Sequence, residues 1–467
     1  MTTFTHETYL SPFTWRYGTD EMKSIYSETH KRKLLRQVWI ALATAQMKAG
    51  LVTEIQVKQL IEHKDDIDVD RATEIENEIH HDLMAEIKTY AEQCPEAGSI
   101  IHLGATSMDI LDNMDAIRLK EALDIIIKKA KALLVLYIEK MEQYKDLPCM
   151  AFTHIQPAEP TTVGYRFAQT AQDLIDDIKE LENVRDNIRG KGMKGAVGTA
   201  ASYFELLEGT SMSPFEMEQI VMDTLNLKAF SASTQVYTRK QDYRVVNAIS
   251  SLSCTLYKFF IDFRLLQSPP IGEWSEPFGK KQVGSSAMPF KRNPINSEKI
   301  DSLCRFISSQ PNTAYQNAAS TLLERTLDDS ANRRIVLPET FLAMDEVLKT
   351  AAKVISGMNI HMSAIKKNMN NYGVFAATEK LLMQLGKHGA NRQDMHEVIR
   401  EHSLKAWAEV QEGEVNNLAQ SLTSDERVLK YLSKETALSL LNANEYVGDA
   451  PLRTQLIIEE AKEILSK

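Results

Sequence analysis

Long stretches of the chain contain neither glycine nor proline, and within them apolar residues recur at steps of three and four. This spacing gathers the apolar side chains on one face and is typical of amphipathic helices. The pattern predicts five long helices, several of them longer than the average of about 11–12 residues. We expect these helices at residues 105–147, 165–189, 238–267, 312–337 and 339–356.

Alternation of apolar and polar residues, which is the pattern of a half-buried strand, is scarce. Residues 194–201 and 229–233 fit short strands and glycine-rich loops equally well. We therefore predict an all-α fold of three helical domains, with a central bundle of five long helices. The predicted domains are residues 1–111, 112–363 and 364–467. Helices this long usually carry apolar residues on more than one face, so we expect the bundle to pack between chains of a homo-oligomer.

Composition limits the class of protein. The chain has 467 residues, 43% hydrophobic and 25% charged, which excludes a mostly disordered protein. Its net charge of −10 argues against non-specific nucleic-acid binding but leaves room for a small anionic ligand held by a local basic cluster. No apolar run is long enough to span a membrane. The N-terminus has no secretory pattern, and the four cysteines form no CxxC pair, so we expect a cytoplasmic protein.

The densest group of polar functional residues lies in VGSSAMPFKRNPINSEK, residues 283–299. Ser285 and Ser286 follow a glycine, and Lys291, Arg292 and Asn293 add charge and directed donors before a helix predicted around residues 297–306. Such a loop can bind an anion through backbone N–H groups and hydroxyls. The plain alternative is a surface loop with capping serines.

Three other segments contain candidate groups. His154, in FTHIQPAEPTTVG, lies at a proline-interrupted turn and is either a structural residue or a proton donor or acceptor. His80, His81 and Asp82, with His102 further on, lack the spacing of a zinc site and favour phosphate or carboxylate contacts. The run ERTLDDSANRR is either a solvated face or a set of arginine forks for anions. GKGMKGAVG looks like a phosphate cradle but lacks P-loop spacing, so a loop between helices is the simpler interpretation.

The segment GSSAMPFKRNP, here called the 284–294 loop, resembles the pattern GSSxMPxKxNP of the fumarase/aspartase superfamily and matches all eight fixed positions. Within that superfamily the chain resembles the adenylosuccinate lyase family over about residues 11–400. The matching segments are SPFTWRYGTDEM, HHDLMAE, IIHLGATS, FTHIQPA, QVYTRK, ERTLDDSANRR and NRQDMHEVIR. Argininosuccinate lyase shares the loop but is not expected to contain RTLDDSANRR.

The resemblance implies two β-eliminations in purine nucleotide biosynthesis. One gives AMP and fumarate from adenylosuccinate, and the other gives AICAR and fumarate from succinylaminoimidazole carboxamide ribotide. It also implies a homotetramer whose core contains twenty helices, with each active site built from three subunits. No cofactor, metal, nucleic acid or membrane is implied.

The resemblance further implies roles for individual residues. Ser285 is the base and His154 the acid, although Ser286 remains a rival for the base. We hypothesise that closure of the 284–294 loop excludes water and brings Lys291 and backbone N–H groups close to Ser285. The implied binding residues are Arg16 and Tyr17 for phosphate and ribose, His81 and Asp82 for the nucleotide, Thr106 and Ser107 for a carboxylate, Gln235 as an amide contact, Lys291 and Asn293 for the succinyl group, and Arg325, Ser330 and Arg334 as an anion clamp.

Two binding positions depart from the pattern. His80 and Lys299 stand where related enzymes often carry arginine, which removes a bidentate fork at position 299 and makes the charge at position 80 depend on pH. Three alternatives to the leading function remain. They are another fumarate-releasing lyase of the argininosuccinate lyase or aspartase type, a non-catalytic structural relative, and a regulatory protein that binds AMP without releasing fumarate.

Overall fold

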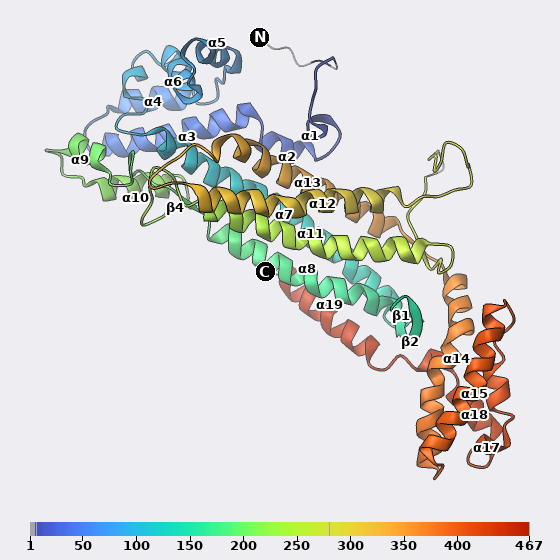
Figure 1. The fold of residues 1–467 in the computed structure, drawn as a ribbon. Coiled ribbons are helices and arrows are strands. Elements are labelled where there is room, and N and C mark those ends of the chain that lie inside the picture. Colours follow the sequence, from blue (N-terminus) through green and yellow to red (C-terminus); the bar gives the residue numbers. More distant parts are fainter. Residues whose placement is uncertain (1–4, 6, 280, 467) are drawn as a thin grey trace. The chain divides into compact units, whose positions relative to one another are not determined.

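The structure is a computed structural model that describes residues 5, 7–279 and 281–466. Part of the N-terminal segment tested for a secretory pattern, residues 1–4 and 6, lies outside these residues. The described chain is almost entirely helical (Figure 1). The helices of its first half are α1 (Pro12–Trp15), α2 (Asp20–Ile25), α3 (Glu28–Lys48), α4 (Glu54–Glu62), α5 (Val69–Ile79), α6 (Asp82–Gln93), η1 (Gly98–Ile100), α7 (Ser107–Tyr144), α8 (Val163–Asp186), α9 (Ala201–Leu207) and α10 (Pro214–Thr224).

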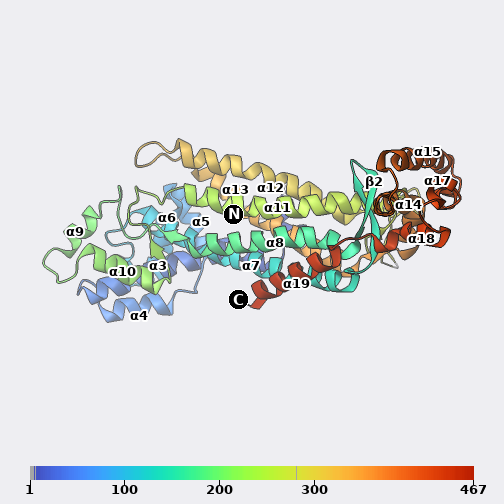
Figure 2. The same cartoon turned by 90° about the horizontal axis from the view of Figure 1, so that it is seen from below.

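The second half contains three more long helices and the C-terminal helices. These are α11 (Lys240–Gln267), α12 (Ile295–Ser320), α13 (Ser330–Gly357), α14 (Met362–Lys387), α15 (Arg392–Gln411), α16 (Leu418–Leu422), α17 (Glu426–Leu429), α18 (Lys434–Leu440), η2 (Ala443–Glu445) and α19 (Ala450–Ser466). Figures 1 and 2 show α7, α8, α11, α12 and α13 running side by side, so the predicted all-α fold with a bundle of five long helices is confirmed. Within the described residues, no helix is both long enough and apolar enough to cross a membrane.

The chain divides into two compact units, and all five long helices contribute residues to both. The first unit comprises Met1–Ala130, Asp177–Cys254 and Ser302–Lys349. The second unit comprises Lys131–Asp176, Thr255–Asp301 and Thr350–Lys467. The division into three domains stays a prediction.

Three long helices, α7, α8 and α11, lie close to their predicted ranges, but the bounds predicted for the other two were wrong. The predicted helices were separated at Pro311 and Pro338, yet both prolines lie inside helices, Pro311 in α12 and Pro338 in α13. A proline inside a helix costs about 3 kcal/mol. Buried side chains on both sides, such as Ile307 and Ala314 around Pro311, offset this cost by packing. The break between the two helices falls instead at residues 321–329.

The described strands form three two-stranded sheets. They are β1 (Pro148–Thr153) with β2 (Gln156–Thr162), β3 (Arg189–Gly190) with β4 (Lys228–Ala229), and β5 (Trp274–Ser275) with β6 (Asn359–Ile360). The β1–β2 pair is an antiparallel hairpin in which Thr153 faces Gln156 across the turn. This hairpin was not among the predicted elements, because Pro157 and Pro160 obscure the strand pattern. Of the two ambiguous segments, residues 194–201 form no strand, and in residues 229–233 only Ala229 belongs to a strand, the short β4.

An aromatic cluster forms the core of the second unit. Tyr137, Phe167, Phe259 and Trp274 are almost fully buried, and the rings of Phe167 and Trp274 stack with centroids 5.0 Å apart. Trp274 belongs to β5, which comes shortly before Gly284 in the chain. The core therefore holds the chain just before the 284–294 loop begins.

Candidate functional site

The predicted site residues fall in both compact units. The first unit contains Arg16, Tyr17, His80, His81, Asp82, Thr106, Ser107, Gln235, Arg325, Ser330 and Arg334. The second unit contains His154, Ser285, Ser286, Lys291, Asn293 and Lys299.

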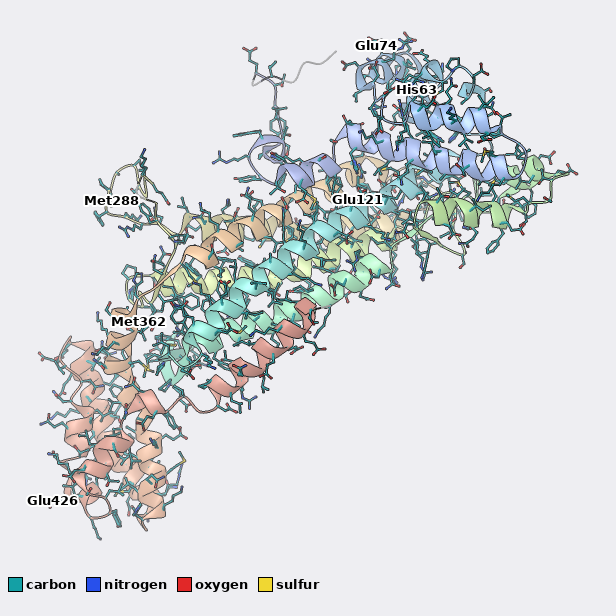
Figure 3. All side chains as sticks on the ribbon, turned by 180° about the vertical axis from the view of Figure 1, so that it is seen from behind. His63, Glu74, Glu121, Met288, Met362 and Glu426 are labelled. Atoms are coloured by element: carbon teal, nitrogen blue, oxygen red, sulfur yellow. The ribbon has the colours of Figure 1, made fainter. Side chains whose placement is uncertain are left out.

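The 284–294 loop closes on itself at its base. Asn293 Nδ2 donates a hydrogen bond to the carbonyl oxygen of Gly284 at 3.1 Å. A Cβ at position 284 would lie 2.1 Å from the carbonyl oxygen of Lys291, so only glycine fits there. Figure 3 shows Met288 on a loop that projects from the helices, and Met288 and Phe290 are exposed. Asn293 therefore shapes the loop in addition to its predicted role at the succinyl group.

Ser285 and Ser286 have different surroundings. The Ser285 Oγ accepts hydrogen bonds from the backbone N–H groups of Ala287 at 3.3 Å and Met288 at 3.1 Å. Ser286 is exposed, and its hydroxyl makes no hydrogen bond with the residues that the structure describes. Two N–H donors aimed at one oxygen stabilise a negative charge on it, so this geometry favours Ser285 over Ser286 as the base.

A buried carboxylate holds the helix that follows the loop. Glu276 Oε1 accepts hydrogen bonds from the N–H of Ser297 at 2.6 Å and from its hydroxyl at 2.7 Å. Glu276 Oε2 accepts from the N–H and side-chain amide of Asn296 at 3.2 and 2.7 Å. These bonds satisfy free N–H groups at the start of α12 and complement its positive end. Lys299, in the first turns of α12, is held on this fixed helix.

His154 lies at the tip of the β1–β2 hairpin. His154 and Ile155 have φ angles of 53° and 62°, as the two central residues of a tight hairpin turn require. Both side chains are exposed. A histidine at an exposed turn tip has no packing role in its own unit, which favours the functional interpretation of His154 over the structural one. His154 and Ser285 make no hydrogen bond with each other among the described residues.

In the first unit the structure brings together Asp82 and Arg334, which are 252 positions apart, with Arg334 Nη2 3.0 Å from Asp82 Oδ2. Burial alone would raise the pKa of Asp82. Lys31, the N–H of Leu83 and Arg334 outweigh burial, and they hold this pKa below its ordinary value.

Asp82 and Arg334 line a cavity of about 500 Å³, within the usual size of a small-molecule site. A cavity of about 750 Å³ in the second unit is lined by none of the predicted residues.

The histidines beside Asp82 differ from His102. His80 ends α5 with φ 54°, and His81 caps α6 by accepting the N–H of Met84 at its Nδ1, 3.3 Å away. Both are accessible. His102 instead accepts a hydrogen bond from Trp39 Nε1 at 3.2 Å, and its burial lowers its pKa. His102 is therefore a structural residue, whereas His80 and His81 can be reached by a ligand.

The segment with Arg16 and Tyr17 is fixed against α13. The N–H of Gly18 donates to Glu346 Oε2 at 3.2 Å, and the N–H of Thr19 donates to Asp345 Oδ2 at 2.6 Å. The Arg16 side chain is exposed and lies against the ring of Tyr17, 5.9 Å from its centroid. Arg16 is thus held on a fixed backbone with its guanidinium accessible to an anion.

The GKGMKGAVG segment encloses a carboxylate of the protein itself. Asp109, in the first turn of α7, accepts hydrogen bonds from Lys191 Nζ, the N–H of Lys194 and the N–H of Gly195 at 2.5, 3.2 and 3.2 Å. The Asp109 Oδ2 also accepts the N–H of Thr106 at 3.1 Å. The cradle is therefore occupied, and its function is to fix the turn that carries Thr106 and Ser107.

A buried network connects three segments that contain predicted site residues. Arg239 Nη1 donates to Asp112 Oδ1 at 2.9 Å, and Arg239 Nε donates to Asp329 Oδ2 at 2.6 Å. Arg325 Nη1 donates to Asp329 Oδ1 at 2.7 Å. Burial alone would raise the pKa of Asp329, but the guanidinium groups of Arg239 and Arg325 more than offset it and lower the pKa.

The N–H of Gln235 donates to the carbonyl oxygen of Glu324 at 3.2 Å, so Gln235 lies beside the residue that precedes Arg325. Arg239 and Asp329 were not among the predicted residues, although both lie in the family motifs QVYTRK and ERTLDDSANRR. The signal that could have identified them is their charge within a motif that was recognised for other residues.

The arrangement provides two kinds of chemistry. The second unit offers a hydroxyl whose oxyanion is stabilised by backbone N–H groups and an exposed imidazole, which suit proton transfer. The first unit offers the exposed guanidinium groups of Arg16 and Arg334, which suit an anionic ligand, and Arg334 also lines a cavity. No group of three or more His, Cys, Asp or Glu side chains within the described residues is placed to bind a metal.

Comparison with known proteins identifies the relatives of the chain. Residues 15–308 match a family described as Lyase, and residues 375–455 match one described as Adenylosuccinate lyase C-terminus. The adenylosuccinate lyase of Schistosoma mansoni is 39% identical over 90% of this chain and 88% of the relative. That of Saccharomyces cerevisiae is 37% identical over 97% of this chain and 95% of the relative. The 3-carboxy-cis,cis-muconate lactonizing enzyme of Pseudomonas putida has the same fold, with a TM-score of 0.85 at 21% identity over 97% of this chain and 99% of that one.

Proposed function

Since the chain belongs to the adenylosuccinate lyase family, we propose that it eliminates fumarate from adenylosuccinate, giving AMP, and from succinylaminoimidazole carboxamide ribotide, giving AICAR. The observation that carries this proposal is identity of 37% and 39% to adenylosuccinate lyases over at least 90% of the chain. All the groups needed for the reaction, Ser285, His154, Lys291 and Asn293, are present. This disfavours a structural relative that has lost its chemistry.

Ser285 is the base in this proposal. The reaction removes a proton from the carbon beside a carboxylate of the succinyl group, and the C–N bond then breaks. A serine hydroxyl is a weak base unless its anion is stabilised. The N–H groups of Ala287 and Met288, which already point at the Ser285 Oγ, support this role. Closure of the 284–294 loop brings Lys291 close and excludes water, which strengthens these contacts.

His154 is the acid that protonates the departing nitrogen. A positioned imidazole is the side chain that most often transfers protons in enzymes. The exposure of His154 at a hairpin tip supports this role, because its ring is available to a substrate.

The remaining predicted residues bind the substrate. Arg16 and Tyr17 bind the phosphate and ribose, His81 and Asp82 the nucleotide, Thr106 and Ser107 a carboxylate, and Lys291 and Asn293 the succinyl end. Gln235 makes an amide contact, and Arg325, Ser330 and Arg334 complete an anion clamp. His80, Ser286 and Lys299 are the other predicted binding residues. The approach of Arg334 to Asp82 and of Gln235 to the segment with Arg325 supports grouping residues that are far apart in the sequence.

We propose further that the chain forms a homotetramer with active sites shared by three subunits. Large apolar side chains are exposed on the long helices of the single chain, among them Val135 on α7, Ile261 on α11 and Ile335 on α13. Contact with other copies would remove this apolar surface from water. We also place the protein in the cytoplasm, which agrees with its free cysteines.

The test of the function is turnover of adenylosuccinate by the purified chain, followed by the change in purine absorbance as AMP appears. We expect AMP and fumarate in equal amounts. Argininosuccinate and aspartate serve as controls, and turnover of either one without turnover of adenylosuccinate would overturn the proposal.

A further inference from the structure

Arg239 connects three segments of the first unit through two buried ion pairs. It directly precedes α11, and its guanidinium bonds to Asp112 on α7 and to Asp329, which directly precedes α13. Each of these three segments also carries residues of the proposed site. Thr106 precedes α7, Gln235 lies four residues before Arg239, and Arg325 lies four residues before Asp329.

The exposure of the side chains separates Arg239 from the substrate. The Arg239 side chain is 1% exposed, whereas that of Arg325 is 14% exposed. The remaining Arg239 Nη2 is buried and has no hydrogen-bond partner among the described residues. A ligand can therefore reach Arg325, but Arg239 can act only through its carboxylate partners.

Asp329 is the link between the two arginines. Its Oδ2 accepts a hydrogen bond from Arg239 Nε, and its Oδ1 accepts one from Arg325 Nη1. Because both oxygens are engaged, the direction of the Arg325 guanidinium depends on the orientation of this carboxylate. That orientation is set in turn by the Arg239 fork, which is itself fixed to α7 through Asp112.

We propose that Arg239 is a positioning residue for substrate binding: acting through Asp329, it aims the Arg325 guanidinium at an anionic group of the substrate. This inference rests on the proposed function and extends it to a residue that does not touch the substrate. A lysine at position 239 would keep the buried positive charge, but its single ammonium group cannot supply the fork that joins two carboxylates.

The experiment compares Arg239→Lys, Arg325→Ala and the double variant in the adenylosuccinate assay. A contact made equally in the bound substrate and the transition state affects KM and leaves kcat almost unchanged. Arg239→Lys should therefore raise KM about tenfold and change kcat less than about threefold. In the Arg325→Ala background, the same substitution should change KM less than about twofold, because the residue that it positions is gone.

Arg36→Lys is the matched control. Arg36 is fully buried and pairs with Glu86 at 2.9 Å, and it contacts none of the proposed site residues. The Arg36→Lys variant should unfold at a lower temperature than the wild type, by about as much as Arg239→Lys does, but its KM should not rise. If Arg239→Lys does not fold, Asp329→Asn supplies the same test, because it breaks the link while keeping the shape of the side chain.

Three results would overturn the inference: an unchanged KM in Arg239→Lys, an equal rise in KM for Arg36→Lys, or a KM effect that persists undiminished without Arg325. If the wild-type chain cleaves adenylosuccinate, each of these three results refutes the inference but leaves the proposed function intact. A wild type that does not cleave adenylosuccinate refutes the proposed function, and the inference fails with it.

Discussion

Replacing Ser285 by alanine tests the base directly, and Ser286→Ala is its natural comparison because the two serines are adjacent in one loop. Only the Ser285 Oγ receives backbone N–H groups, from Ala287 at 3.3 Å and Met288 at 3.1 Å, among the described residues of this loop. These lengths are at the long end for neutral hydrogen bonds, and we expect them to shorten once the oxygen is charged.

The size of the effect follows from the role of Ser285. A positioned base contributes about 10²- to 10⁴-fold, and one N–H donor to an oxyanion about 10²- to 10³-fold. Ser285→Ala should therefore lower kcat by about 10² to 10⁴, or about 3 to 5 kcal/mol of activation free energy. Ser286→Ala should lower kcat less than about tenfold, even where KM rises, because its hydroxyl has no such donors.

Loss of activity in Ser285→Ala has a second explanation, because the same hydroxyl shapes the turn. Ser285→Asn separates the two explanations, since an asparagine side chain can accept the same backbone N–H groups but is not a base. We expect Ser285→Asn to be as inactive as Ser285→Ala in the AMP assay. A kcat above about one tenth of wild type in either variant, or an equal loss in Ser286→Ala, would refute the reasoning.

Three further predictions concern other parts of the molecule. His154→Ala should lower kcat by about 10² to 10⁴, and near-normal turnover would remove His154 from the mechanism. Inactive His81→Ala and Ser285→Ala proteins should regain activity when mixed and reassembled, whereas inactive mixtures with proven subunit exchange would contradict shared sites. Finally, the unfolded chain protonates His102 near its ordinary pKa of about 6.5, while burial lowers the pKa in the folded state. The free energy of unfolding should therefore fall as pH drops below about 6.5, and urea titrations of His102→Asn, which cannot protonate, should show a weaker fall.

The family and its reaction class could be predicted from the sequence, because the motifs that indicate them consist of residue types at fixed spacing. The 284–294 loop matches its pattern at every fixed position, and the chain belongs to the family that the motifs indicated. Helices α7, α8 and α11 were also predictable, since glycine and proline are absent from most of their length and apolar residues recur at helical spacing.

The bounds of α12 and α13 required the tertiary structure. The sequence shows Pro311 and Pro338, which locally oppose a helix, and it shows Leu322, Leu323 and Leu327 at helical spacing where the chain forms a loop. Those three leucines are 65%, 89% and 71% exposed, so they contribute no packing that would hold a helix. Burial against distant parts of the chain therefore decided where these helices begin and end, even where the local sequence favoured the opposite.

Roles that depend on a partner far along the chain were also decided only in three dimensions. In the sequence, nothing connects Arg239 with Asp112, 127 positions before it, or with Asp329, 90 positions after it. Their ion pairs exist because α7, α11 and α13 pack together and exclude water from the space between them. Residue type and spacing thus determined which groups the protein has, whereas packing determined which of them meet, because burial strengthens a charge interaction that water would screen.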